Sequence, residues 1–342
     1  MYFSKKVKFV FLLMVMILAT AGQLWAQRRL PGGRIQIQLA SLVPEATPWG
    51  AALNRMAAEW SAATNGEVEL VIFHGGVAGS EAEVLRRLRL NQIQAAVFTS
   101  AGIREVMPEV MAISYPFLIR TDAELEAVMT AIRPELDAGI ERSGFMTLAW
   151  TNAGWLRVFS RDPVFTPADL RGQRLGASPD DQEMLQLFRT MGFQVVPVGV
   201  NDTLVSLRAN RMDAVYWSPV MVAGAQLFGV ANNMSSMNLA PFMGGILMNQ
   251  TAWRRIPERH RPRLLEISRQ IEAEIGGAIS ALDEEAIAIM QRHGLRINEP
   301  TPVQRQEWYN EINRHEDRLV GTIFDRNLFG RISAVLQEFR GR

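Results

Sequence analysis

The chain has 342 residues, 48% of them hydrophobic, and its 36 Lys and Arg against 35 Asp and Glu give a formal net charge of +1. This balance lacks the strongly basic face that nucleic-acid binding requires. No cysteine is present, which excludes disulfides, thiol chemistry and the lipid-modified cysteine of a bacterial lipoprotein.

Residues 1–26 have the pattern of a cleaved export signal. Three lysines within residues 5–8 are followed by the apolar run 10–18 and by small residues that offer cleavage sites at Ala21 and Ala26. The run is shorter than the ~20 apolar residues of a membrane-spanning helix, so we expect cleavage rather than anchoring. The mature chain is then expected in the periplasm, exported and not lipidated, with 33 basic and 35 acidic residues.

The next segment alternates between strand and helix patterns. Strands are expected at residues 35–40, 68–73 and 93–99, and helices at residues 49–63 and from Ser80 onward. Ser80 and Glu83 have the spacing of a capping box, which predicts that a helix begins there. The order strand–helix–strand–helix–strand predicts a mainly parallel sheet covered by helices.

A second unit of the same kind begins after Asn152. Its expected strands are residues 156–159, 174–177, 194–197 and 212–217, its expected helices are 180–191 and 203–209, and an apolar run at 239–248 is expected to return to the first sheet. A long amphipathic helix is expected over about 258–292, followed by a charged helical end.

These patterns predict an α/β clamshell of two lobes. Lobe I is expected to comprise residues 31–152 and about 240–279, and lobe II residues 153–239 and about 280–342, with a hinge between the lobes and the long helix crossing them. In open α/β sheets, ligands bind at the carboxyl ends of the strands, which here corresponds to the cleft between the lobes.

Four segments match, in order and in spacing, the motifs of one known family. They are residues 42–49 (L-V-P-E-A-T-P-W), 73–81 (F-H-G-G-V-A-G-S-E), 115–118 (Y-P-F-L) and 165–172 (F-T-P-A-D-L-R-G). Together they resemble the substrate-binding proteins of TRAP-type (tripartite ATP-independent periplasmic) transporters, the family that includes the C4-dicarboxylate-binding proteins. The resemblance covers most of residues 35–290.

The resemblance implies a periplasmic-binding-protein fold with mainly parallel sheets. It also implies a non-enzymatic protein that captures a small organic ligand and delivers it to TRAP membrane permease subunits, in some members with a helical-repeat periplasmic partner. No cofactor is expected. The four histidines, His74, His260, His293 and His315, lack metal-ligand spacing, so no metal site is expected either.

The family's arginines contact the substrate carboxylate, and this chain departs from the pattern at those positions. The principal arginine falls on Gly176, which is otherwise interpreted as a strand glycine that allows close backbone approach. Arg174 coincides with another basic position of the family and is not assigned to the ligand. A second family arginine falls near Trp155, so Arg157 is either a displaced carboxylate clamp or a residue of a surface or inter-lobe salt bridge.

Other ligand-contacting positions of the family fall mainly on apolar residues. The full set of expected ligand-binding residues is Leu42, Thr99, Trp155, Arg157, Gly176, Val200, Tyr216, Trp217 and Phe242. We therefore expect a weakly charged or apolar ligand held by Trp155, Tyr216 and Trp217. The same aromatic residues could instead be ordinary interior residues.

Three alternatives stay open at this point. One is a carboxylate receptor with a displaced arginine, and the others are a periplasmic enzyme or a sensor on the same fold. An enzyme would need paired carboxylates or a nucleophile with its base. The acidic group Asp180, Asp181 and Glu183 is better interpreted as the first turn of a helix.

Overall fold

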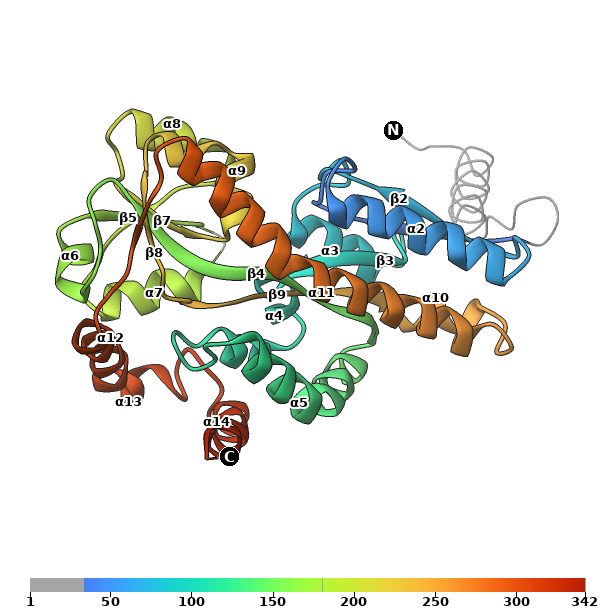
Figure 1. The fold of residues 1–342 in the computed structure, drawn as a ribbon. Coiled ribbons are helices and arrows are strands. Elements are labelled where there is room, and N and C mark those ends of the chain that lie inside the picture. The colour runs from blue at the N-terminus through green and yellow to red at the C-terminus, as the bar shows by residue number, and fades with distance from the viewer. Residues whose placement is uncertain (1–33, 180, 342) are drawn as a thin grey trace, which may run out of the picture. The chain divides into compact units, whose positions relative to one another are not determined.

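The computed structural model describes residues 34–179 and 181–341, and the expected export signal lies outside them. Figure 1 shows the helices and strands and their labels along the chain. No helix in the described ranges is long and apolar enough to cross a membrane.

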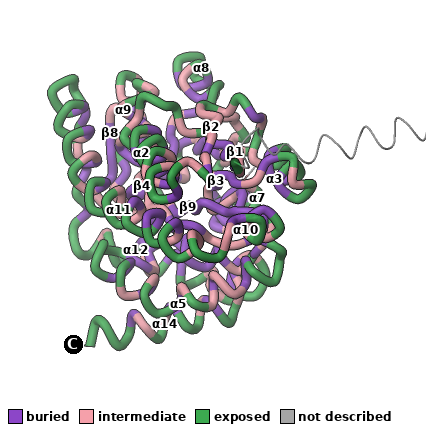
Figure 2. The backbone as a smooth tube through the Cα atoms, turned by 90° about the vertical axis from the view of Figure 1, so that its right-hand side faces the viewer, coloured by how far each residue is buried: buried purple, intermediate pink, exposed green. Residues whose placement is uncertain are grey.

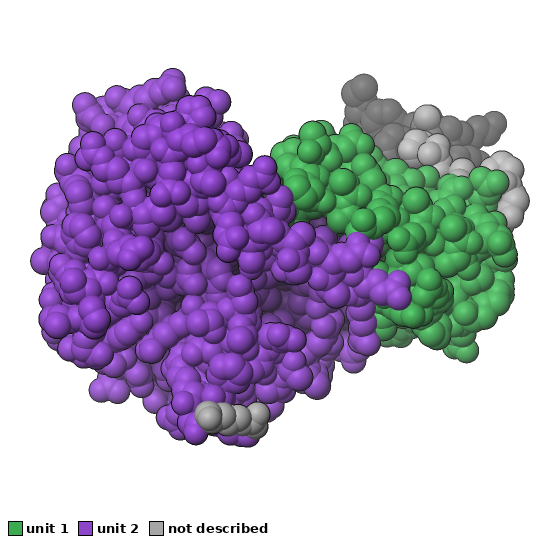
Figure 3. Space-filling model, viewed as in Figure 1, with its two compact units in different colours: residues 1–96, 248–268 green, residues 97–247, 269–342 purple. Residues whose placement is uncertain are grey.

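The chain divides into two compact units (Figure 3). Unit 1 consists of the described part of Met1–Ala96 together with Met248–Ser268, and unit 2 consists of Val97–Leu247 with the described part of Arg269–Arg342. The chain passes between the units within strands β3 and β9 and within helix α11. These bounds describe compactness, and the bounds of the two functional lobes stay a prediction.

Unit 1 is built on three parallel strands. Its elements are β1 (Ile35–Ala40), α2 (Pro48–Ala63), β2 (Val68–Phe73), α3 (Glu81–Arg89), the start of β3 (Ala95–Thr99), α10 (Gln250–Arg255) and the start of α11 (Arg261–Arg292). Strand β1 pairs in parallel with β2 on one side and β3 on the other. The capping box predicted at Ser80 and Glu83 is present and begins α3. Trp60 of α2 is fully buried in the core of this unit.

Unit 2 holds the larger part of the chain. Its strands are β4 (Phe145–Ser160), β5 (Arg174–Ala177), β6 (Gln194–Pro197), β7 (Ala214–Trp217), β8 (Asn233–Ser235), most of β9 (Ala240–Asn249) and β10 (Arg296–Asn298). Its helices are α4 (Ser100–Arg104), α5 (Asp122–Arg142), α6 (Pro167–Arg171), α7 (Gln182–Thr190), α8 (Thr203–Arg208), α9 (Pro219–Gly224), the rest of α11, α12 (Pro302–Arg314), α13 (Glu316–Leu319) and α14 (Arg326–Arg340), with short 3-10 turns at Pro108–Ser114, Val200–Asp202 and Leu227–Gly229.

Strand β4 organises the sheet of unit 2. It is 16 residues long, much longer than the strand expected at residues 156–159, and it pairs in antiparallel fashion with β7 and β8. Strand β5 pairs in parallel with β6 and β7, β10 pairs in parallel with β8, and β9 is a neighbour of β4. The sheet is therefore antiparallel where β4 pairs with β7 and β8, and parallel in the β5–β6, β5–β7 and β8–β10 pairs.

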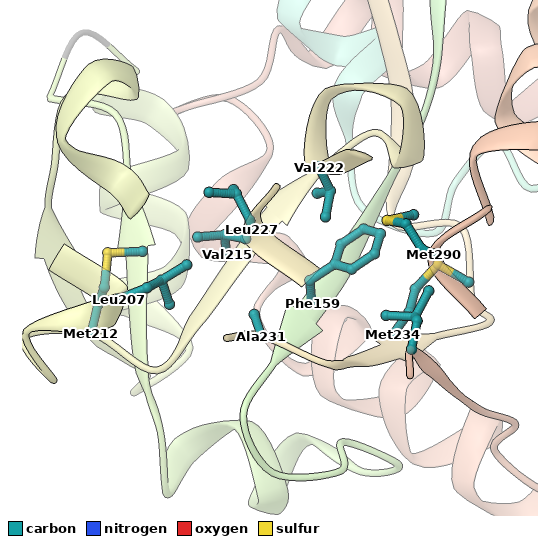
Figure 4. Close-up of a cluster of buried hydrophobic side chains, with 10 residues drawn as sticks. Phe159, Leu207, Met212, Val215, Val222, Leu227, Ala231, Met234 and Met290 are labelled. Carbon is teal, nitrogen blue, oxygen red and sulfur yellow. The ribbon is translucent and has the colours of Figure 1, made fainter. Parts of the chain in front are cut away.

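Buried positions concentrate in the strands, whereas the helices expose one face (Figure 2). Every position of β9 is buried except Phe242, which is half-buried. A cluster of apolar side chains in unit 2 surrounds Phe159 of β4, with Val215 of β7 and Met290 of α11 on either side (Figure 4). This cluster supports one end of the β4–β7 strand pair, where the candidate site lies.

Candidate functional site

The register of β4 against β7 places Arg157 directly opposite Trp217. Two residues further along β4, Phe159 lies opposite Val215 in the same register. Because side chains alternate along a strand, all four residues share one face of the sheet. Phe159 and Val215 belong to the apolar cluster of Figure 4, and Trp217 packs against it. Arg157 and the half-buried Trp217 therefore share one face of the sheet, next to an apolar core.

The side chain of Arg157 is held through one nitrogen only. Its Nε donates a hydrogen bond of 3.1 Å to Oδ1 of Asn238, and Nδ2 of Asn238 donates in turn to the backbone oxygen of Arg120 at 3.0 Å. Within residues 34–179 and 181–341, Arg157 has no salt bridge and its two terminal nitrogens have no hydrogen-bond partner. Among the described residues Arg157 is thus oriented by a neutral amide, and its planar fork has the geometry to bind an anion.

Burial lowers the pKa of Arg157, and the charges of Asp283 and Asp122 act in the opposite direction. An arginine side chain starts from a pKa above 12, so the group stays a cation. A cation in such a position has lost part of its hydration. Two conditions for a charge-assisted contact to a carboxylate are therefore met, a fixed orientation and reduced competition from water.

Asp283 on α11 is a buried carboxyl group that contacts β4. It is 5% exposed, and it accepts weak hydrogen bonds from the backbone N–H groups of Trp155 at 3.5 Å and Val220 at 3.4 Å. Gly154 has φ +93°, and a Cβ atom there would lie 2.5 Å from Oδ2 of Asp283. Only glycine therefore lets β4 approach the carboxylate this closely.

Trp155 is buried rather than open to a ligand. It is 5% exposed, and its Nε1 donates to Oδ1 of Asp122 at 2.8 Å. The other oxygen of Asp122 accepts from Oγ of Ser280 at 2.9 Å, so this carboxylate connects β4, α5 and α11. These contacts favour the interpretation of Trp155 as an interior aromatic residue.

Tyr216 lies on the opposite face of β7 from Trp217. Its ring centre is 5.0 Å from that of Phe188 on α7, and its hydroxyl donates to Oδ2 of Asp181 at 3.5 Å. Burial raises the pKa of Tyr216 well above its usual value of 10. Tyr216 is therefore packed against α7 and points away from Arg157, whereas Trp217 lies opposite Arg157 in the strand register.

The acidic group near residue 181 begins a helix, as predicted. Asp181 accepts from the backbone N–H of Met184 and caps α7, and Glu183 in the first turn forms an ion pair with Arg104. Asp180 lies outside the described residues. No group of three His, Cys, Asp or Glu that could hold a metal ion is found among the residues that the structure describes.

Gly176 faces the apolar core of unit 2. A Cβ atom at this position would lie 2.3 Å from Cε of Met212, whose side chain is fully buried. This geometry fits a strand glycine that allows close packing. Arg174, two residues earlier, donates to both carboxylate oxygens of Asp213, at 2.7 Å from Nε and 2.8 Å from Nη2. Arg174 is thus already neutralised, and neither position supplies a free cation.

The remaining expected residues lie in several places. Leu42 belongs to unit 1 and is 45% exposed, whereas Val200 lies in a 3-10 turn of unit 2 and is 53% exposed. Thr99 is the N-cap residue of α4, and Phe242 is the half-buried position of β9. The strand register places Arg157 opposite Trp217, and the role of the other seven residues stays a prediction.

Three residues near Arg157 were missed by the sequence reasoning, namely Asn238, Asp283 and Asp122. Asp283 had a recognisable signal, because it lies on the same helical stripe as the buried Ile279 and Met290 of α11. A carboxylate on a buried stripe normally has a specific partner. Asn238 had no such signal, since its contact to Arg157 joins positions 81 residues apart.

Comparison with known proteins identifies the family. Residues 39–320 match the model "Bacterial extracellular solute-binding protein, family 7". A solute-binding protein of Chromohalobacter salexigens is 22% identical over 262 residues, 75% of this chain and 76% of its own length. A solved TRAP periplasmic solute-binding protein from the same species, with bound D-glucuronate, has a TM-score of 0.80 at 18% identity and covers 88% of this chain and 99% of that one.

A second solved structure gives the same result. A TRAP periplasmic solute-binding protein of Ralstonia eutropha H16, with bound (S)-2-acetolactate, has a TM-score of 0.80 at 19% identity and covers 89% of this chain and 99% of that one. The expected fold class is thereby confirmed as a two-domain α/β periplasmic-binding-protein fold with a mostly parallel sheet.

Proteins of this family are periplasmic receptors rather than enzymes, and they bind small ligands and deliver them to membrane permease subunits. The enzyme alternative is therefore set aside. The match extends over most of the described chain and includes all of β4, β7, α11 and α12. The chain belongs to family 7 of the bacterial extracellular solute-binding proteins, the substrate-binding components of TRAP-type transporters.

Proposed function

We propose that this receptor captures a small organic carboxylate, with Arg157 as the anchor and Trp217 as the flat apolar surface beside it. The observation that carries the proposal is the free guanidinium fork of Arg157, which is oriented by Asn238 and has no carboxylate partner among the described residues. A ligand carboxylate can accept two parallel hydrogen bonds from such a fork. The ring of Trp217 suits the C–H face of the same ligand.

The ligands of the solved relatives support a charged ligand. D-glucuronate and (S)-2-acetolactate are both carboxylates, and each is bound by a protein with this fold. They argue against the weakly charged or apolar ligand expected from the sequence. That expectation treated the missing arginine at Gly176 as a loss of charge from the site, whereas Arg157 supplies a cation from β4.

Isothermal titration calorimetry with D-glucuronate, (S)-2-acetolactate, succinate and uncharged D-glucose tests the proposal. At least one carboxylate should bind, and D-glucose should not. Arg157→Gln removes a charge-assisted contact worth ~1.5–3 kcal/mol, so the Kd should rise about 10- to 150-fold. Arg157→Lys keeps the charge but loses the fork, and it should give an intermediate value.

Arg174→Gln is the matched control, because Arg174 is already paired with Asp213. Its Kd should stay within about twofold of the wild-type value. Trp217→Ala should weaken binding less than Arg157→Gln does. If Arg157→Gln leaves the Kd of every carboxylate unchanged, or if Trp217→Ala is the more damaging change, the anchor is not Arg157.

We further propose that residues 1–26 are removed on export and that the mature protein carries no lipid. The charged start, the short apolar run and the absence of cysteine support this. An intact-mass measurement of the exported protein should give a chain that begins near Gly22 or Gln27. A chain that keeps Met1 and sediments with membranes would contradict it.

A further inference from the structure

One cation and two carboxylates lie close together at the candidate site. Asp122 and Asp283 both act electrostatically on Arg157, yet neither forms a salt bridge with it. The cluster thus has a formal charge of −1 before any ligand is present. A ligand carboxylate at Arg157 would bring three negative charges against one positive charge. Asp122 is exposed, whereas Asp283 is buried, so the excess of negative charge is costly mainly at Asp283 unless a proton or a cation enters with the ligand.

The two carboxylates are not held equally well. Asp122 accepts from two side-chain donors at 2.8 and 2.9 Å and begins α5, where the helix dipole favours a negative charge. Asp283 is buried and has only two backbone N–H donors, at 3.4 and 3.5 Å. These distances lie at the weak end of hydrogen bonding. The ionised carboxylate of Asp283 is therefore stabilised by weaker hydrogen bonds than that of Asp122.

The electrostatic surroundings of Asp283 agree with this. Burial raises its pKa to about 6, the charge of Asp122 raises it as well, and the N–H donors of Trp155 and Val220 and the charge of Arg157 lower it. The groups that face it are Arg157 from β4 and Asp122 from α5, whereas α9 offers only backbone and no titratable side chain. Its neighbours Glu284 and Glu285 on α11 are exposed.

We propose that the ligand carboxylate binds at Arg157 together with one proton, which Asp283 takes up from solvent. The proposal rests on the proposed function of Arg157. The physical reason is competition for one cation, because the ligand occupies the charge that stabilises ionised Asp283 in the empty site. Ligand binding therefore raises the pKa of Asp283 further, and proton binding strengthens ligand binding to the same extent.

The pH dependence of binding follows from this coupling. Below about pH 6, Asp283 is already protonated in the empty protein, and the Kd should not depend on pH. Above about pH 6 each ligand must bring a proton, so the Kd should rise by up to about tenfold per pH unit. The ligand supplies no proton itself, because carboxyl groups of this kind ionise near about pH 4.

The test is calorimetry of D-glucuronate, or of whichever carboxylate binds, at pH 7.5 in phosphate and in Tris buffer. These buffers differ in ionisation enthalpy, so the difference in observed heat gives the number of protons taken up. The wild-type protein should take up between about half a proton and one proton per ligand. Asp283→Asn should still bind the ligand, with uptake near zero and a Kd that is flat between pH 6 and pH 8.

Glu284→Gln, an exposed neighbour on the same helix, is the matched control and should keep the wild-type proton uptake. A carboxylate that binds to the wild-type protein with no proton uptake overturns the coupling and leaves the proposed function standing. Unchanged uptake in Asp283→Asn overturns the assignment to Asp283. Failure of every carboxylate to bind contradicts the proposed function instead. Because the wild-type measurement decides the coupling alone, the test does not depend on the variant folding.

Discussion

Arg157 and Arg174 carry the same charge in the same sheet but have different partners. Arg174 forms two hydrogen bonds with the carboxylate of Asp213, whereas Arg157 is oriented by the neutral amide of Asn238. A guanidinium bound to a carboxylate must lose that partner before it can bind a ligand, and a guanidinium bound to an amide keeps its full charge and its fork. The neutral partner supports the proposed role of Arg157 as the ligand anchor.

Restoring the family's arginine at Gly176 should not restore an anchor. A Cβ atom added at Gly176 would point at Met212 in the apolar cluster. Gly176→Arg would therefore place a charged side chain in the core. We expect a loss of about 3 kcal/mol or more in the free energy of unfolding. Urea unfolding measures this, with Val200→Arg at an exposed position as a near-neutral control. A stable Gly176→Arg protein with tighter succinate binding would contradict the expectation.

At the scale of elements, the sequence predicted those strands and helices that have local signals. The capping box at Ser80, which begins α3, belongs to this group. Strand β4 was predicted at a quarter of its length, because residues 151–154 (T-N-A-G) have the composition of a turn although they continue the strand. Helix α5 was not among the expected elements. The antiparallel register that places Arg157 opposite Trp217 depends on pairing across 60 residues, which no local pattern encodes.

The space around two glycines, Gly244 in β9 and Gly277 in α11, predicts opposite effects of alanine on the free energy of unfolding. A Cβ atom at Gly244 would lie 2.5 Å from the backbone oxygen of Phe98 and 2.9 Å from Oγ1 of Thr151, so Gly244→Ala must displace a neighbouring strand. It should cost about 1–3 kcal/mol. Gly277 in α11 has open space around it, and Gly277→Ala should instead stabilise the protein by about 0.5–1 kcal/mol.

Urea unfolding of both alanine variants against the wild-type protein measures the difference. The two substitutions add the same methyl group, so opposite signs would show that packing against β9 decides the cost. Two stabilising changes would mean that β9 is not packed as tightly as the distances indicate.

At the scale of the whole molecule, the family and the fold class could be predicted from four short motifs and the alternation of strands and helices. The chemistry of the site could be predicted only in part. Arg157 and Trp217 were among the expected residues, but the partner that leaves Arg157 free and the carboxylate of Asp283 come from distant parts of the chain. Whether an arginine is neutralised depends on its neighbours in space, which motif positions do not report.

Asp283 also makes the stability of the molecule depend on pH. Its pKa is raised from 3.8 to about 6 in the folded chain, so its favourable contribution is fully present below pH 3.8 and is lost as the pH rises through about 6. The difference between these pKa values corresponds to about 3 kcal/mol. Asp283→Asn should therefore stabilise the protein at pH 8 by up to this amount and have little effect at pH 4.

Urea unfolding at pH 4, 6 and 8 gives the comparison, with Glu284→Gln as the exposed control on the same helix. A gain for Asp283→Asn that is equal at all three pH values would show that its effect is one of packing. A loss at pH 8 would show that the charged form of Asp283 is needed to hold Trp155 and Val220.

The division of unit 1 into two separate segments has a consequence for the order of biosynthesis. Its first segment leaves the ribosome early, but Met248–Ser268 follows only after the whole stretch Val97–Leu247 has been made. Asn249, which donates to the backbone oxygen of Leu88, is therefore missing while the early strands emerge. The amino-terminal unit cannot complete its core during most of translation. We therefore expect the amino-terminal unit to stay incompletely folded until Met248–Ser268 has been made.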